Sequence, residues 1–127
     1  MIRTRETIAF TVHGIPIPKM GELPLRNAAT LRETQLATWI NRIGWTARAV
    51  MAGRPAIEGP VRAILEVVMP NRNPVDSCCM WSSVLDGIRQ IIILNDDQVA
   101  NLKITRSVNA HDPCVRITIE PIQEGFQ

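Results

Sequence analysis

The most constraining feature of the sequence is a strand-like segment, GPVRAILEVVMP at residues 59–70, that leads directly into a helix-like one. Every second residue in it is apolar and the positions between are mixed, which is the period of a half-buried strand. The apolar set is Val61, Ala63, Leu65, Val67 and Met69. After a turn at 71–75, we expect a helix from Asp76 or Ser77 to Arg89, because Asp and Ser favour the N-cap position. This succession predicts helices packed on a sheet.

The remaining elements follow from similar patterns. They are strands at 7–14, 99–108 and 114–122 and a long helix at 28–51. The last two strands, joined by NAHDP, are expected to form an antiparallel pair. The run IIIL at 91–94 is either a short buried strand or an apolar approach to NDDQ at 95–98, an acidic turn. The order of elements predicts an α+β fold, a single small domain over 1–127 with one mixed sheet and two main helices.

Charge and cysteine content restrict the class of protein only loosely. The net charge is +2, from twelve arginines, two lysines and twelve acids. Arginine is suited to bidentate phosphate contacts, but this balance alone favours an ordinary solvated surface. Three cysteines, an odd number, argue against a disulfide framework. The N-terminal MIRTRETIAF lacks the apolar core of a signal peptide, and no apolar run reaches membrane-spanning length. We therefore expect a cytoplasmic protein that does not bind membranes.

Four acidic residues cluster between the start of the expected second helix and the turn after it: Asp76, Asp86, Asp96 and Asp97. Of these, Asp76 at the start of the helix and Asp96 and Asp97 in the turn are candidate metal ligands. Mg²⁺ takes hard oxygen ligands, usually one or two carboxylates with waters and substrate phosphate. A strand–helix–strand path of about twenty residues can bring Asp76 and Asp96 to one edge of the sheet. The competing interpretation makes Asp76 a helix cap and Asp96–Asp97 a solvated turn, and composition and spacing alone favour it.

The segment MPNRNPVDSCCMWSSVLDGI at 69–88, with NDDQV at 95–99, resembles the core of the RusA-type Holliday-junction resolvases. The family pattern is roughly M-P-D-R-x-x-x-D-x-D-N-L-x-K-x-x-x-D-A-L, then an apolar stretch and D-D-x-Q-V. The flanking IPIP, the long helix, AGRPAIEGPV and the closing IEP agree with it as well. The resemblance covers nearly the whole chain. It implies a homodimeric α+β nuclease, mostly encoded by phages and prophages, that cuts four-way DNA junctions symmetrically with Mg²⁺.

The motif positions match the family pattern only in part. The matching carboxylates are Asp76, Asp86 and Asp96, with Asp97 next to the last of these. The family aspartate, asparagine and lysine are replaced by Cys78, Cys79 and Ser82, respectively. The resemblance therefore implies catalytic and metal-ligating roles for Asp76, Asp96 and Asp97. Mg²⁺ is the expected ion, with Mn²⁺ as the alternative.

The departures from the pattern predict a slower enzyme. A thiol is a soft ligand that is mostly protonated at pH 7, and Ser82 supplies no positive charge to the scissile phosphate. Three compensations stay open. Asp97 could replace the missing carboxylate, Arg72 or Arg89 could replace the lysine, and Cys78 could bind a softer metal such as Mn²⁺ or Zn²⁺. The plain alternative is that both adjacent cysteines are small core residues of a half-buried helix.

These residues leave two functional hypotheses open. The first is a RusA-like crossover-junction endodeoxyribonuclease that acts as a homodimer in recombination, repair or phage DNA processing, with one acidic site per subunit. Its expected phosphate-contacting residues are Lys19, Arg26, Arg72, Arg89 and Arg106. The second is a degenerate relative that binds branched DNA, or a protein, without cutting it. A structural phage protein is a third possibility, which requires the absence of a basic face beside Asp76.

Overall fold

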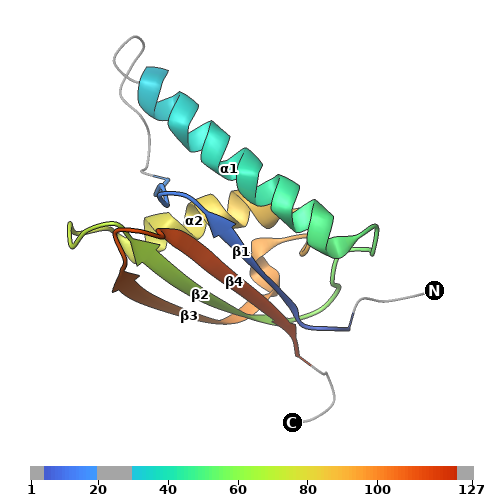
Figure 1. Ribbon diagram of the computed structural model, residues 1–127. Helices are drawn as coiled ribbons and strands as arrows, with labels where there is room; N and C mark the ends of the chain where they lie inside the picture. The colour runs from blue at the N-terminus through green and yellow to red at the C-terminus, as the bar shows by residue number, and fades with distance from the viewer. Residues whose placement is uncertain (1–4, 20–29, 123–127) are drawn as a thin grey trace.

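The computed structural model describes residues 5–19 and 30–122, so Arg26 lies outside the described residues. The elements are β1 (Ile8–His13), α1 (Thr30–Met51), β2 (Val61–Met69), α2 (Ser77–Ile88), the 3₁₀ turn η2 (Asp96–Gln98), β3 (Val99–Val108) and β4 (Cys114–Pro121). The strands form one four-stranded sheet, and both helices pack on the same face of it (Figure 1). This arrangement confirms the expected α+β domain with a mixed sheet and two main helices.

The strand order is β1-β4-β2-β3, with β2 and β3 parallel and the other neighbours antiparallel. The expectation that 99–108 and 114–122 pair with each other is therefore wrong, because β2 lies between them. The physical reason is visible in the burial of the two strands. β4 buries most of its apolar side chains and has a neighbour on each side, whereas the largely polar β3 takes the border of the sheet.

The path β2–α2–β3 is a crossover connection between parallel strands. Val61 pairs with Val99 and Met69 pairs with Val108, so both strands begin at one edge of the sheet and end at the other. Residues 91–94 form only isolated bridges on the way back, with Ile92 and Ile93 fully buried. They are thus the apolar approach to η2 rather than a strand.

The core lies between the two helices and the inner face of the sheet. The two helices approach closely at Gly44 and Gly87. The contact leaves no room for a side chain on Gly87, since a Cβ atom there would lie 2.5 Å from Ile43 Cγ2. This contact fixes α2 over the sheet and so fixes both ends of the crossover.

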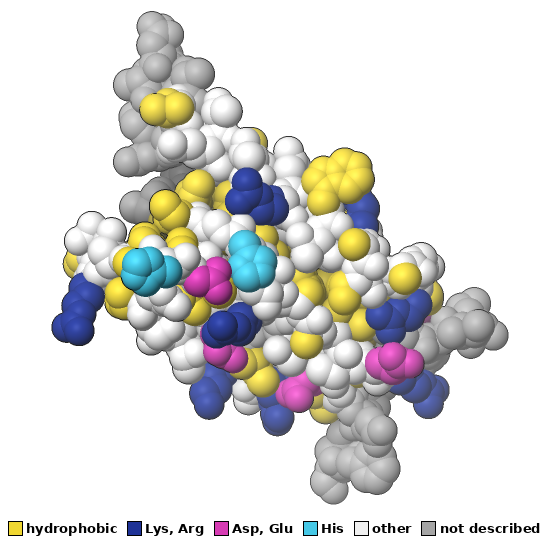
Figure 2. All heavy atoms as spheres, viewed as in Figure 1, with side chains coloured by type: hydrophobic (Ala, Val, Ile, Leu, Met, Phe, Trp, Pro, Cys, Tyr) yellow, Lys and Arg dark blue, Asp and Glu magenta, His cyan; other side chains and the backbone are white. Residues whose placement is uncertain are grey.

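The outer face of the sheet is polar, with ion pairs such as Arg62–Glu120 at 3.6 Å and Arg116–Glu66 at 3.5 Å. In the view of Figure 2, Lys and Arg side chains are spread among Asp and Glu rather than gathered in one block. The face seen in this view therefore does not present a single basic patch.

Candidate active site

Asp76 is the N-cap residue of α2, at the edge of the sheet where β2 and β3 end. Its Oδ1 atom accepts hydrogen bonds from the backbone N–H groups of Cys78, at 2.8 Å, and Cys79, at 3.2 Å. These bonds satisfy two donors that the first turn of a helix leaves open. The capping interpretation is thus confirmed. Because the cap uses Oδ1, it is compatible with a further ligand on Oδ2.

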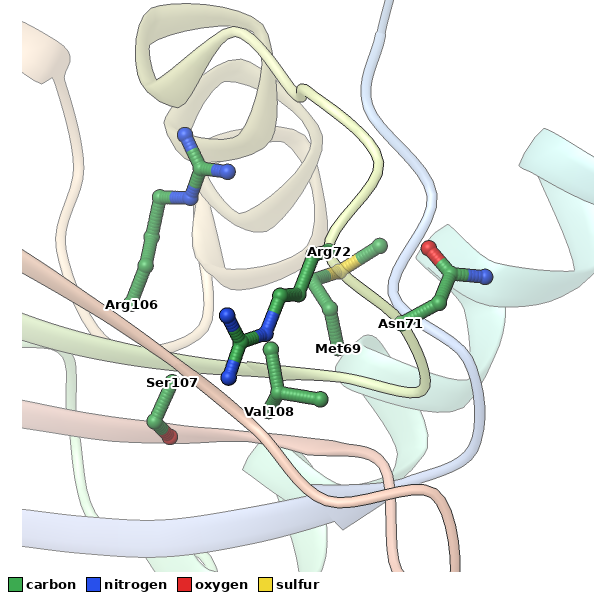
Figure 3. A pocket seen from close by; sticks show the side chains of 6 residues that line it. All are labelled: Met69, Asn71, Arg72, Arg106, Ser107 and Val108. Atoms are coloured by element: carbon green, nitrogen blue, oxygen red, sulfur yellow. The ribbon is translucent and has the colours of Figure 1, made fainter.

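An open hollow of about 610 Å³ lies at the same edge. It is lined by Met69, Asn71, Arg72, Arg106, Ser107 and Val108 (Figure 3). Arg106 Nη1 donates a hydrogen bond of 3.0 Å to the carbonyl oxygen of Val75, the residue before Asp76. Two guanidinium groups beside the N-terminus of a helix favour an anionic ligand such as phosphate. A basic surface beside Asp76 therefore exists, which argues against the purely structural protein.

The substituted positions form the first turns of α2. Cys78 is exposed and Cys79 is partly exposed, so the core interpretation is wrong for Cys78. Burial raises the pKa of the Cys79 thiol above its ordinary value, and the Asp76 carboxylate raises it further. The Cys79 thiol therefore gives up its proton less readily than an ordinary thiol does. The Ser82 hydroxyl donates to the carbonyl oxygen of Cys78 at 3.0 Å, within the helix.

Asp86, the matching helix aspartate, holds two cations. Its Oδ2 lies 2.7 Å from Lys19 Nζ, and its Oδ1 lies 3.5 Å from Arg89 Nη1. The Lys19 N–H also donates to the carbonyl oxygen of Cys79 at 2.9 Å, which fixes this segment along α2. Arg89 is the C-cap of α2, a helix of 12 residues that is about 18 Å long. Within one chain, Arg89 therefore cannot supply the missing lysine charge beside Asp76.

The second acidic group stands on a fixed turn. Asp96 and Asp97 are exposed at the start of η2, and the Gln98 side chain holds that turn in place. Its four hydrogen-bond partners are the N–H groups of Leu94 (2.7 Å) and Asn95 (3.0 Å) and the carbonyl oxygens of Ile57 and Gly59 (both 2.8 Å). Gln98 is a positioning residue for the acidic pair. The family pattern also has a glutamine at this position, but the sequence alone does not show that its side chain holds the turn.

The two acidic groups lie at opposite edges of the sheet. η2 precedes Val99, which pairs with Val61 at the start of β2, whereas Asp76 follows the end of β2. The nine residues of β2 span roughly 26 Å at about 3.3 Å per residue. The expectation that Asp76 and Asp96 meet at one edge is therefore wrong for a single chain. A crossover returns the chain to the start of the next parallel strand, not to the end of the previous one.

The distance between Asp76 and Asp96 determines whether both residues of one chain can bind the same metal ion. Within residues 5–19 and 30–122, no group of three His, Cys, Asp or Glu side chains is placed to bind one. Mg²⁺ needs oxygen ligands at about 2.1 Å in octahedral geometry. Asp76 and Asp96 of one chain are therefore too far apart to bind the same ion.

The sequence matches a known protein family over most of its length. Residues 18–120 match a protein-family model described as Endodeoxyribonuclease RusA. The match places the chain among DNA endonucleases and spans β2, α2, β3 and both acidic groups. The chain belongs to the RusA endodeoxyribonuclease family. No curated protein matches the chain. In the part of the chain that the structure describes, no helix is long and apolar enough to cross a membrane.

Proposed function

We propose that the protein is a RusA-like Holliday-junction resolvase that makes paired symmetric cuts in four-way DNA junctions with Mg²⁺ or Mn²⁺. Its role would lie in recombination, repair or phage DNA processing in the cytoplasm of a bacterial or phage-infected cell. The observation that carries this proposal is Asp76 beside the arginine-lined hollow, in a chain of the RusA family. Arg72 and Arg106 hold DNA phosphates there, which positions the substrate without reading its sequence.

The proposed enzyme is a homodimer in which each acidic site joins two chains. One chain separates Asp76 from Asp96 by about the length of β2, so a single ion cannot bind both. A two-fold axis can bring Asp96 and Asp97 of the partner subunit to Asp76, and the same rotation creates a second, identical site. Two equivalent sites suit a substrate that must be cut twice. The dimer therefore keeps one site per subunit but divides its ligands between the chains.

The carboxylates have separate roles in this site. Asp76 and Asp96 are the hard oxygen ligands at the matching motif positions. Asp97 is the substitute for the carboxylate missing at Cys78, because it is exposed next to Asp96 on the turn that Gln98 fixes. When bound, Mg²⁺ offsets negative charge at the scissile phosphate.

The cation missing at Ser82 also has a substitute. Arg72 lines the hollow together with Arg106 (Figure 3). Arg106 in turn bonds to the carbonyl oxygen of Val75, the residue before Asp76. Lys19 and Arg89 share Asp86, which leaves their charge partly neutralised. Arg72 is therefore the proposed source of positive charge at the reacting phosphate, and Lys19 and Arg89 are assigned to more distant phosphates.

A cleavage assay tests the proposal. A labelled four-way junction is incubated with the protein and Mg²⁺, or separately Mn²⁺, beside a linear duplex. Paired symmetric nicks are expected in the junction, and Asp76→Asn should abolish them. Glu66→Gln removes a carboxylate that pairs with Arg116 on the outer face of the sheet, so it should leave cleavage unchanged. Cleavage that survives Asp76→Asn would contradict the assigned role.

A second candidate function is binding of branched DNA without cleavage. It is favoured by a specific observation: Cys78 offers no carboxylate and Ser82 bonds within its own helix. Binding should weaken steeply with salt because phosphate contacts release counterions. Arg72→Ala should lower the salt slope by about 1, whereas Arg62→Ala, on the outer face, should not. Tight binding without nicks would select this function, and a flat salt dependence would reject both.

A further inference from the structure

The outer face of α1 carries an exposed tryptophan. The core-facing side of this helix includes Ile43 and Ala47, which are fully buried. Trp45 follows Ile43 by two residues, so it lies about 200° further around the helix and faces away from the core. The residue is 69% exposed. An exposed indole lacks the hydrophobic stabilisation that burial of so large a side chain brings, so Trp45 is a candidate contact for a ligand.

The neighbours of Trp45 on this face are cationic, polar or small. Arg42 and Arg48 lie one turn before and one turn after it, and Asn41 and Ala49 occupy the other two adjacent positions. All four residues are exposed. A protein-binding surface usually presents a contiguous apolar patch, which the surroundings of Trp45 lack. An aromatic platform among cations is instead typical of surfaces that bind single-stranded nucleic acid.

The cations of this face are not neutralised by acidic residues. From 34 to 57 the sequence has three arginines and no Asp or Glu. One of them, Arg54, pairs with Glu6, but within residues 5–19 and 30–122 neither Arg42 nor Arg48 forms an ion pair. In the view of Figure 2, no Asp or Glu side chain is visible along α1. The outer face of α1 is therefore locally positive, which suits phosphate.

Arg48 also orients the tryptophan ring. Its Cζ atom lies 5.5 Å from the centroid of the Trp45 ring, which is within the range of a cation–π contact. This contact restricts an exposed side chain before any ligand arrives, so less rotamer freedom is lost on binding. The exposure of the residue leaves the rest of the ring open to a second planar group. Trp45 is thus a preformed platform for stacking.

Arg42 connects this face to the edge of the sheet that carries the candidate active site. Its Nη1 donates a hydrogen bond of 3.0 Å to the carbonyl oxygen of His13. His13 ends β1 and pairs with Cys114 of β4, which in turn pairs with Val68 near the end of β2. Two strand spacings, roughly 10 Å, separate His13 from the strand that leads to Asp76. The outer face of α1 therefore adjoins the proposed DNA-binding edge.

We propose that α1 binds an unpaired strand of branched DNA, with one base stacked on Trp45 and the flanking phosphates held by Arg42 and Arg48. The inference rests on the proposed function and adds a substrate class to it, namely junctions or forks in which an arm is partly single-stranded. Stacking on Trp45 requires an unpaired base, because a base within a duplex is already stacked on its neighbours. It does not read sequence, since every base has a π-face.

Binding of a single-stranded oligonucleotide tests this surface without cleavage. A fluorescently labelled oligo(dT) is titrated with protein in the presence of a chelator, and its anisotropy gives the Kd. Trp45→Ala should raise the Kd by about 5- to 150-fold, the effect of removing one side chain on which a base stacks. Trp45→Phe keeps an aromatic ring and should weaken binding less. Thermal melting checks that both variants are folded.

Two arginine substitutions provide a matched comparison. Arg48→Ala removes a cation beside the ring, so it should weaken oligonucleotide binding and lower the salt slope by about 0.7. Arg116→Ala removes an arginine from the outer face of the sheet, where it lies 3.5 Å from Glu66, and should change neither quantity. Equal effects of the two substitutions would mean that only the overall charge matters, which would overturn the proposal.

Intrinsic fluorescence provides a readout that is specific to stacking. A base stacked on an indole quenches the emission of that indole. Trp39 is buried and Trp81 is partly buried, so quenching by oligo(dT) should come mainly from Trp45. It should disappear in Trp45→Phe. Quenching of the same size in Trp45→Phe would place the bound base elsewhere and overturn the proposal.

The remaining outcomes separate this inference from the proposed function. Wild-type protein that does not bind oligo(dT), or binds it equally well after Trp45→Ala, would overturn the α1 surface. Self-association that is lost in Trp45→Ala, with unchanged oligonucleotide binding, would assign Trp45 to a protein contact instead. Neither result depends on cleavage, so both are compatible with Asp76-dependent cutting of junctions. Trp45-dependent binding without any cutting would support the α1 surface and contradict the nuclease assignment.

Discussion

At one edge of the sheet, Asp76 caps α2 beside two arginines, whereas at the other edge Asp96 and Asp97 begin a turn that Gln98 holds in place. The first region has cations and a helix N-terminus but only one carboxylate. The second has two adjacent carboxylates on a rigid support. The first region lacks further carboxylates, and the second lacks the cations and the helix N-terminus. The comparison teaches that residues of one sequence motif need not form one site within one chain.

The largest expected effect comes from mixing two inactive variants. Asp76→Asn in one chain and Asp96→Asn/Asp97→Asn in the other should each abolish junction cleavage as homodimers. A mixed dimer retains one site with all three original carboxylates, because that site takes Asp76 from one chain and the acidic pair from the other. Mixing should therefore restore single nicks, measured on a labelled junction after the two proteins exchange subunits.

The control for this experiment is each variant exchanged with itself, which should remain inactive. If the mixture is also inactive although mixed dimers have formed, each site lies within one chain. The division of the site proposed above would then be wrong. If both strands are cut as fast as in the wild type, the carboxylates do not act at the proposed positions.

The next effect should arise from completing the Asp76 region. Cys78→Asp, Cys79→Asn and Ser82→Lys together add a hard ligand and a positive charge to the first turns of α2. Single-turnover cleavage should rise by about 10²-fold, the size of effect that one charge-stabilising group has in comparable sites. Gln35→Lys, on the exposed surface of α1, adds a lysine elsewhere and should not change the rate. An unchanged rate in the triple variant would show that existing residues already compensate.

The same comparison shows what the sequence could reveal. The alternation at 61–69 and the Asp-Ser pair at 76–77 are local signals, and they correctly predict β2 and the start of α2. The partner of a strand is not a local property. Both 99–108 and 114–122 look like strands, but only the sheet order shows that β2 separates them.

The errors at the candidate site have the same origin. The spacing from Asp76 to Asp96 is compatible with a return to either edge of the sheet, and the parallel pairing of β2 with β3 decides which. The role of Gln98 depends on Ile57 and Gly59, about forty residues earlier, so no nearby residue reveals it. The types of residue indicated the chemistry of the candidate site. Only the strand topology of the sheet showed where its residues lie.

Gln98→Leu should destabilise the turn that carries Asp96 and Asp97 without changing the region around Asp76. It removes four hydrogen bonds, and each contributes about 0.5–1.5 kcal/mol net. The free energy of unfolding, measured by urea denaturation, should fall by at least about 2 kcal/mol, and junction cleavage should fall with it. Gln35→Leu, on the exposed face of α1, should change stability by less than about 0.5 kcal/mol. Equal stability of the two variants would contradict the positioning role.

The smallest expected effect is a difference in stability between two substitutions of Asp76. It separates the role of Asp76 as a helix cap from its role as a negative charge. Asn is as good an N-cap as Asp, so Asp76→Asn should keep the bonds to Cys78 and Cys79 while removing the negative charge. Asp76→Ala loses the cap as well, and should lower the free energy of unfolding by about 1 kcal/mol relative to Asp76→Asn. Both variants should lose junction cleavage to the same extent. A cleavage defect in Asp76→Ala alone would mean that Asp76 acts by holding the helix N-terminus, and the charge at this edge would then have to come from another residue.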